Sequence, residues 1–120
     1  MNAFELSQLI TECSQSNSPY LEFLRVPSLS IGLYMLPANG VDLQEPHTED
    51  EVYYIVSGRG FIQVGPENRA VEPGTLVYVG AHVEHRFHTI TEDLAILVFF
   101  APAEYTHSQA TGEPGISAKV

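Results

Sequence analysis

The first segment of the chain, residues 2–16, has the hydrophobic spacing of an amphipathic helix. Its apolar side chains recur at intervals of three and four residues, at Leu6, Leu9, Ile10 and Cys13. The polar run that follows ends in Ser18-Pro19, and turn-forming residues followed by proline typically end a helix. The pattern therefore predicts one short N-terminal helix.

From residue 20 onward, short β-prone runs alternate with segments rich in Gly, Pro, Asn and Asp. The runs are Tyr20–Val26, Ser30–Leu36, Val52–Val56, Phe61–Val64, Thr75–Val79, Glu84–Thr89 and Leu94–Phe100. We expect Gly58-Arg59-Gly60 to be a hairpin turn and Thr91–Asp93 to be a break between two strands. Strands at this spacing predict an all-β sandwich or barrel.

The length of 120 residues is that of one domain. We expect a helix and linker over 1–18, a barrel over 19–105 and a loosely held C-terminal extension over 106–120. Five Lys and Arg against fifteen Asp and Glu give a net charge of −10 at pH 7. Because this charge repels phosphate backbones and anionic lipid headgroups, we expect neither a nucleic-acid partner nor a membrane partner.

Cysteine use and hydropathy favour a cytoplasmic protein. Cys13 is the single cysteine, so the chain cannot form an internal disulfide. The start of the chain lacks the features of a signal peptide. The longest strongly apolar run, Leu94–Pro102, is about half of the ~20 residues that a transmembrane helix needs.

The first stretch that could carry chemistry is Glu45–Glu51. In an extended segment alternate side chains share a face, so Glu45, His47, Glu49 and Glu51 would point the same way. An imidazole among carboxylates is either a solvated acidic surface or a metal site. We expect Glu49 and Asp50 to face solvent rather than to bind a metal ion.

A second histidine-bearing stretch follows Pro73-Gly74. If His85 begins a strand, it shares a face with Phe87, while His88 lies on the opposite face. Phe87 is the natural inward residue, so we expect His85 inside and His88 outside. A buried histidine needs a partner, which a carboxylate or a metal ion would supply, although a structural histidine is the simpler alternative.

These residues resemble the two motifs of the cupin superfamily, in its small single-domain conserved-barrel (cupin 2) type. His47, Glu51 and Gly58 are similar to the first motif, and Pro73-Gly74 with His85 to the second. The resemblance implies an all-β antiparallel double-stranded β-helix, a jelly-roll barrel of about eight to eleven strands after the short N-terminal helix. It also implies that the chain pairs as a homodimer.

The resemblance further implies one divalent metal ion, Fe, Mn, Ni or Zn, bound by His47, Glu51 and His85. The first histidine of the family's first motif is missing. Glu45 stands in its place at the shorter spacing, and Gln44 stands there at the longer one. The second motif departs from the family pattern at Gly80, His82 and Thr89; we expect His82 to be a surface histidine.

The function that follows from the resemblance is a metal-dependent activity on a small organic molecule. We expect dioxygenase-like chemistry first and isomerisation second. The alternative is a non-catalytic module that binds a small molecule or a metal ion, because one fold hosts many activities. Candidate pocket residues, chosen by strand parity and size, are Tyr53, Ile55, Gln63, Phe87 and Phe99.

Overall fold

The computed structural model describes residues 1–43 and 45–106. These residues contain one helix, α1 (Leu6–Gln15), and six strands: β1 (Tyr20–Val26), β2 (Leu29–Leu36), β3 (Asp50–Val64), β4 (Glu67–Val71), β5 (Leu76–Val79) and β6 (His85–Ala101). The predicted N-terminal helix is confirmed, but it begins at Leu6 because Glu5 already has extended backbone. The expected C-terminal extension, residues 106–120, lies outside the described residues except for Thr106.

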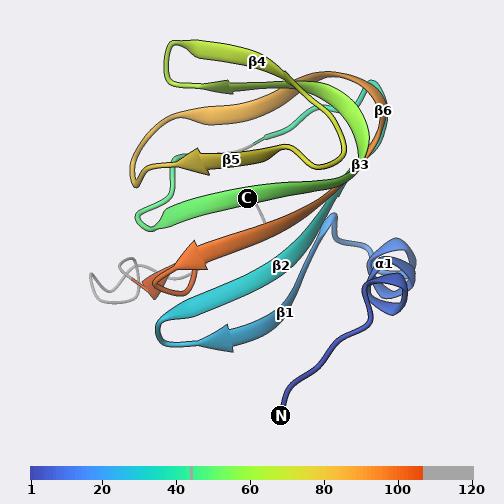
Figure 1. Cartoon of the computed structure of the whole chain (residues 1–120), viewed down its shortest axis with the longest axis vertical. Coiled ribbons are helices and arrows are strands. Elements are labelled where there is room, and N and C mark those ends of the chain that lie inside the picture. Colours follow the sequence, from blue (N-terminus) through green and yellow to red (C-terminus); the bar gives the residue numbers. More distant parts are fainter. Residues whose placement is uncertain (44, 107–120) are drawn as a thin grey trace.

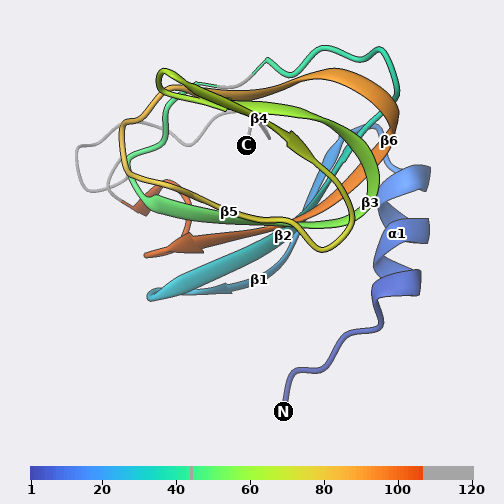
Figure 2. The same ribbon diagram turned by 45° about the horizontal axis from the view of Figure 1, so that its top comes forward.

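The strands form an antiparallel jelly-roll barrel, as the sequence predicted. They follow the order β1-β2-β6-β3-β4, and β5 pairs with the first part of β3. The two long strands, β3 and β6, contain 15 and 17 residues and pair with each other. Each of these two strands bends back near α1. The first and last residues of each strand therefore lie on the side of the barrel away from the helix (Figures 1 and 2).

The two segments expected to separate strands lie inside β3 and β6, so that prediction is wrong. Gly58-Arg59-Gly60 is part of β3, and Thr91–Asp93 is part of β6. The pairing of the two strands shifts register here, which bends the ladder without ending it. Gly58 has a φ of 94°, and a Cβ atom there would lie 2.1 Å from the Asp93 carbonyl oxygen. The described residues therefore form six strands instead of eight to eleven.

Two hydrophobic clusters hold the fold together. The larger cluster fills the barrel and includes Tyr53, Ile55, Phe87 and Phe100, each at most 1% exposed. The smaller one joins α1 to the outer face of the sheet, where it buries the Cys13 thiol. Within residues 1–43 and 45–106 there is no helix with the length and hydrophobicity that a transmembrane span requires.

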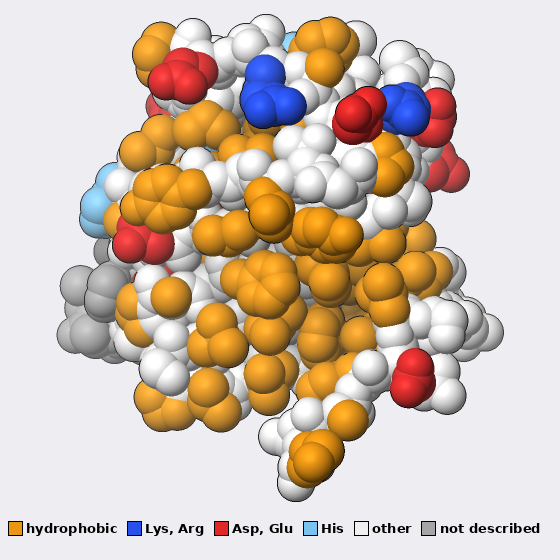
Figure 3. Space-filling view, viewed as in Figure 1, with side chains coloured by type: hydrophobic (Ala, Val, Ile, Leu, Met, Phe, Trp, Pro, Cys, Tyr) orange, Lys and Arg blue, Asp and Glu red, His pale blue; other side chains and the backbone are white. Residues whose placement is uncertain are grey.

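The outer face of the sheet carries apolar side chains beyond the area that α1 covers. Strand pairing aligns the outward-facing apolar side chains in two rows across β5, β3, β6 and β2, and the first row reaches the α1 contact at its last two members: Leu76, Tyr54, Leu97 and Leu33, and Tyr78, Val52, Phe99 and Ile31. Leu76 and Tyr78 are 65% and 63% exposed. Figure 3 shows hydrophobic side chains gathered over these strands, with few charged groups among them.

Candidate metal centre

Three side chains that the sequence singled out converge inside the barrel. His47, Glu51 and His85 are buried, and each offers a ligand atom within 4.8 Å of the other two. His47 precedes β3, Glu51 is the second residue of β3, and His85 is the first residue of β6.

The path of the chain explains why these residues meet. Val79, the last residue of β5, pairs with Glu51, and β6 begins six residues later at His85. Two hydrogen bonds hold the connecting loop against the start of β3. The His82 N–H donates to the His47 carbonyl at 2.6 Å, and the Ala81 N–H donates to the Asp50 carboxylate at 3.0 Å.

The contact between His85 and Glu51 is the most informative part of the site. His85 Nδ1 lies 2.8 Å from the Val83 carbonyl oxygen, which can only accept, so Nδ1 carries the proton and donates. A neutral imidazole then presents the Nε2 lone pair to Glu51 Oε1 at 3.0 Å. Two electron-pair acceptors at this distance repel each other unless a proton or a metal ion lies with them. Both side chains are only 1% exposed.

The missing hydrogen bonds at Glu51 and His85 also indicate that a cation belongs between these side chains. Among the described residues, no hydrogen bond is assigned to either carboxylate oxygen of Glu51 or to His85 Nε2, although Nε2 and Oε1 lie 3.0 Å apart. Buried polar atoms are rarely left in this state. A cation between these atoms would satisfy them.

The proton competes with a metal ion for this position. Burial lowers the pKa of the His85 imidazole, but the Glu51 carboxylate and the Val83 carbonyl raise it by more. The net result is a pKa above the ordinary value for histidine.

His47 has a carboxylate neighbour that the sequence reasoning missed. Its Nε2 lies 3.1 Å from Glu104 Oε2, with both side chains buried, and its ring lies 4.8 Å from that of Phe100. Burial raises the pKa of the Glu104 carboxyl, and His47 lowers it by less. The Glu104 N–H donates to the Ser30 hydroxyl at 2.8 Å, which fixes the backbone after β6. No motif or strand period marks Glu104, so only its position beyond an apolar strand could have drawn attention to it.

Glu49 is buried, at 1% exposure, so the expectation that it faces solvent is wrong. It shares the inward face of His47 and Glu51, as its parity required. The Tyr105 N–H donates to Glu49 Oε1 at 2.9 Å, and the Thr48 hydroxyl donates to Oε2. Asp50 is exposed, as expected.

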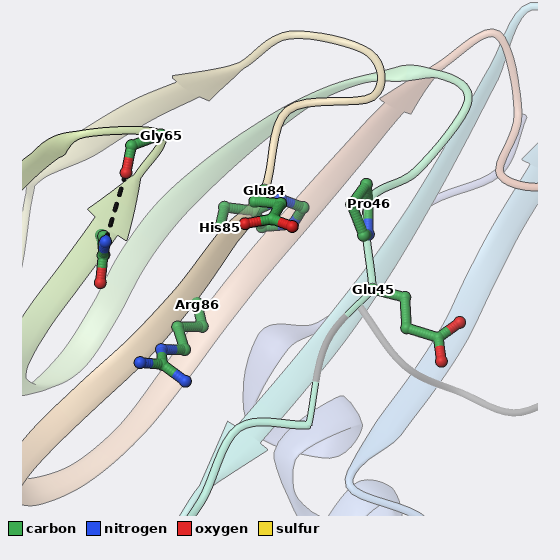
Figure 4. Close-up of a pocket in the computed structure, with 7 residues that line it drawn as sticks. Glu45, Pro46, Gly65, Glu84, His85 and Arg86 are labelled. Carbon is green, nitrogen blue, oxygen red and sulfur yellow. Dashed lines mark hydrogen bonds between the residues drawn. The ribbon is translucent and has the colours of Figure 1, made fainter.

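The two candidates for a further ligand lie apart from the buried group. Glu45 is exposed, and Gln44 lies outside the described residues. Glu45 and His85 both line a cavity of about 450 Å³, together with Pro46, Gln63, Gly65, Glu84 and Arg86. In Figure 4, the Glu45 and Arg86 side chains point away from His85.

The other predicted site residues divide between interior and surface. Tyr53, Ile55 and Phe87 lie in the barrel core, where Tyr53 contacts the His85 ring. Gln63 lines the cavity beside Arg86, its partner across the strands. Phe99 is half-buried on the outer face, so its placement in the pocket is wrong; Phe100 occupies the inner position beside His47. Two further histidines of the described residues lie outside the core: His82 is exposed, and His88 bonds Asn68.

Known proteins resemble this chain in sequence. The cupin domain model Cupin_2 matches residues 32–100. An uncharacterized protein of Streptomyces coelicolor, SCO3923, is 50% identical over 104 residues, which cover 87% of this chain and 99% of that protein.

Solved structures at lower identity share the fold. KdgF from Halomonas sp. is 21% identical with a TM-score of 0.65, over 73% of this chain and 84% of that one. The DMSP lyase DddQ from Ruegeria pomeroyi DSS-3 is 23% identical with a TM-score of 0.60, over 63% of this chain and 39% of that one.

Proposed function

Since the chain belongs to the cupin domain family, we propose that His47, Glu51 and His85 bind one divalent metal ion, with which the protein acts on a small organic molecule. The observation that carries the proposal is the pair of buried acceptors, His85 Nε2 and Glu51 Oε1, 3.0 Å apart. A metal ion removes the repulsion between them and uses both as ligands.

The donor set fits such an ion. Two imidazoles and one carboxylate suit Fe, Mn, Ni or Zn and leave coordination positions open. An ion bound here would supply a Lewis acid and a binding position for an oxygen-containing ligand. The two-histidine, one-carboxylate set favours dioxygenase-like chemistry first, with isomerisation second.

The surrounding residues orient the ligands. The Val83 carbonyl fixes the His85 tautomer, and the Glu104 carboxylate holds the His47 ring. Partners of this kind orient metal-binding imidazoles and raise their basicity. The apolar rings of Phe100 and Tyr53 restrict water around the site. This is a chemical reason for the site to work on an organic substrate.

The DMSP lyase DddQ supports an enzymatic role through its shared fold, which alone does not assign an activity to this chain. The alternative is a non-catalytic module that binds a small molecule or a metal ion. The missing first-motif histidine favours that alternative, because Glu45, which stands near its place, is exposed.

The test is metal analysis of the full chain, purified without chelator and without a nickel affinity column. We expect about one metal ion per chain, lost in His85→Ala and retained in the control His88→Ala. Bound iron, together with oxygen uptake when candidate organic substrates are added, would support dioxygenase chemistry. Bound metal without turnover would support the binding module. Equal metal content in the two variants would refute the site.

A further inference from the structure

The hydroxyl of Tyr20 is a buried donor that nothing in the described chain satisfies. Tyr20 begins β1, belongs to the core inside the barrel, and is 7% exposed. Among the described residues its hydroxyl has no hydrogen-bond partner. Tyr34, its neighbour across the strands, has a similarly buried hydroxyl that donates to Asp42.

The side chain of Tyr20 points along the sheet toward the metal centre. Its backbone pairs with Tyr34, but its ring and hydroxyl lie over Gly32, where a Cβ atom would be only 2.2 Å away. We call a row of residues that pair across the strands a level of the sheet. The ring therefore extends along β2 from the level of Tyr34, past Gly32, toward the level of Ser30.

Ser30 lies at the same level of the sheet as Glu51 of the candidate metal centre. Ser30 pairs with Phe100 of β6, and Phe100 pairs with Glu51 of β3. Neighbouring levels on one face are about 6.7 Å apart, because they are separated by two residues. Glycine at position 32 gives the phenol room on this face, one level along the strands and two strands across the sheet from Glu51, whose carboxylate is near enough to act on the hydroxyl electrostatically.

The surroundings keep this hydroxyl protonated. Burial, followed by the carboxylates of Glu104, Glu22 and Glu51, raises the pKa of Tyr20 far above its ordinary value. Tyr20 is therefore a hydrogen-bond donor throughout the working pH range. An unsatisfied buried hydroxyl is unfavourable compared with phenylalanine at the same position. The tyrosine requires an acceptor that is not among the described residues.

We propose that the Tyr20 hydroxyl donates a hydrogen bond to an oxygen atom of the small ligand bound at the open position of the metal centre. This inference rests on the proposed function, since it requires a metal ion at His47, Glu51 and His85. It assigns the substrate class: a small molecule that presents a carboxylate, carbonyl or hydroxyl oxygen to the ion. An ordered water molecule held for structural reasons is the competing occupant.

The experiment uses the full chain loaded with Co²⁺ and formate as the oxygen ligand, followed by visible absorption. Tyr20→Phe should bind Co²⁺ as wild type does but bind formate about tenfold more weakly, because one hydrogen bond is lost. Tyr34→Phe is the matched control, with the same ring and a hydroxyl bonded elsewhere. It should bind formate as wild type does.

The thermal stability of the metal-free variants provides a second readout. Tyr20→Phe should be at least as stable as wild type, because it removes an unsatisfied hydroxyl. Tyr34→Phe should be less stable, because it removes the buried hydrogen bond from the Tyr34 hydroxyl to the Asp42 carboxylate. Unchanged formate affinity in Tyr20→Phe, or a loss of stability in that metal-free variant, would overturn the inference. So would a wild-type cobalt spectrum that formate leaves unaltered. Failure of the wild type to bind Co²⁺ would instead refute the proposed metal centre.

Discussion

Adding a divalent metal ion to the metal-free protein should raise its melting temperature by about 10 °C, with the ion at a hundred times its dissociation constant. An ion that binds the folded chain and not the unfolded one raises the free energy of unfolding by about 2.7 kcal/mol at a hundred times its dissociation constant. For a chain of 120 residues, unfolding entropy near the midpoint amounts to about 0.25 kcal/mol per degree. The candidate ligand atoms already lie within 4.8 Å of one another, so a small rearrangement is enough to bring them onto one ion.

The assay is differential scanning calorimetry with and without Zn²⁺, on the wild type and two variants. His85→Ala should abolish the shift, and His88→Ala should preserve it because His88 lies on the other face and bonds Asn68. A shift of similar size in His85→Ala would place the ion elsewhere. Absence of a shift in the wild type would refute the reasoning altogether.

The size of this shift should depend on pH in a direction that follows from His85. Its pKa in the fold is raised above the unfolded value, so a proton stabilises the metal-free fold below about pH 6.5. That stabilisation disappears as the pH rises through the folded pKa. Because the metal ion replaces this proton, the rise in melting temperature that Zn²⁺ causes should be small near pH 5. It should grow as the pH rises through the pKa of His85 in the fold. A shift that is constant from pH 5 to 8 would exclude His85 as a ligand.

Four further outcomes are expected. Glu104→Gln should raise the dissociation constant for Zn²⁺ by about 10- to 100-fold in a competition titration, since His47 loses its charged partner; an unchanged constant would contradict this. Glu49→Ala should lower the free energy of unfolding in urea by about 1–3 kcal/mol, because the Tyr105 N–H loses its acceptor; a neutral effect would mean that Glu49 is solvated. Gly58→Ala should cost at least ~1 kcal/mol in the same assay, owing to its positive φ and its contact with Asp93; a stabilising effect would contradict the bend. The outer apolar face supports the prediction of a homodimer, so light scattering should give twice 13.2 kDa, and Tyr78→Glu should halve it; a monomeric wild type would contradict this.

The barrel and the candidate metal-binding group could be predicted because strand alternation and the resemblance to the cupin motifs agree. Alternation of side chains placed His47 and Glu51 on one face, and parity with Phe87 turned His85 inward. These rules hold wherever the strand register is continuous. The same rule failed for Phe99 because the run Leu94–Phe100 is apolar on both faces, so parity could not identify the inner one.

The remaining errors concern long-range structure. Gly58-Arg59-Gly60 has the composition of a turn, and only its partner strand shows that the chain continues as one bent strand. Glu104 comes from beyond the last strand, and its approach to His47 depends on the closing of the barrel. Glu49 was assigned to solvent because a site that engaged every carboxylate would crowd one metal ion with negative charge. Its acceptor role toward the Tyr105 N–H arises from a contact between segments 56 residues apart.

The most direct test of the metal centre is the anomalous diffraction of crystals of the metal-loaded protein, recorded at the absorption edge of the bound ion. We expect one anomalous peak per chain, about 2.0–2.2 Å from a nitrogen of His47, a nitrogen of His85 and an oxygen of Glu51. A peak in the cavity beside Glu45 and Glu84, or at His88, would contradict the assignment. So would loaded crystals that show no peak inside the barrel.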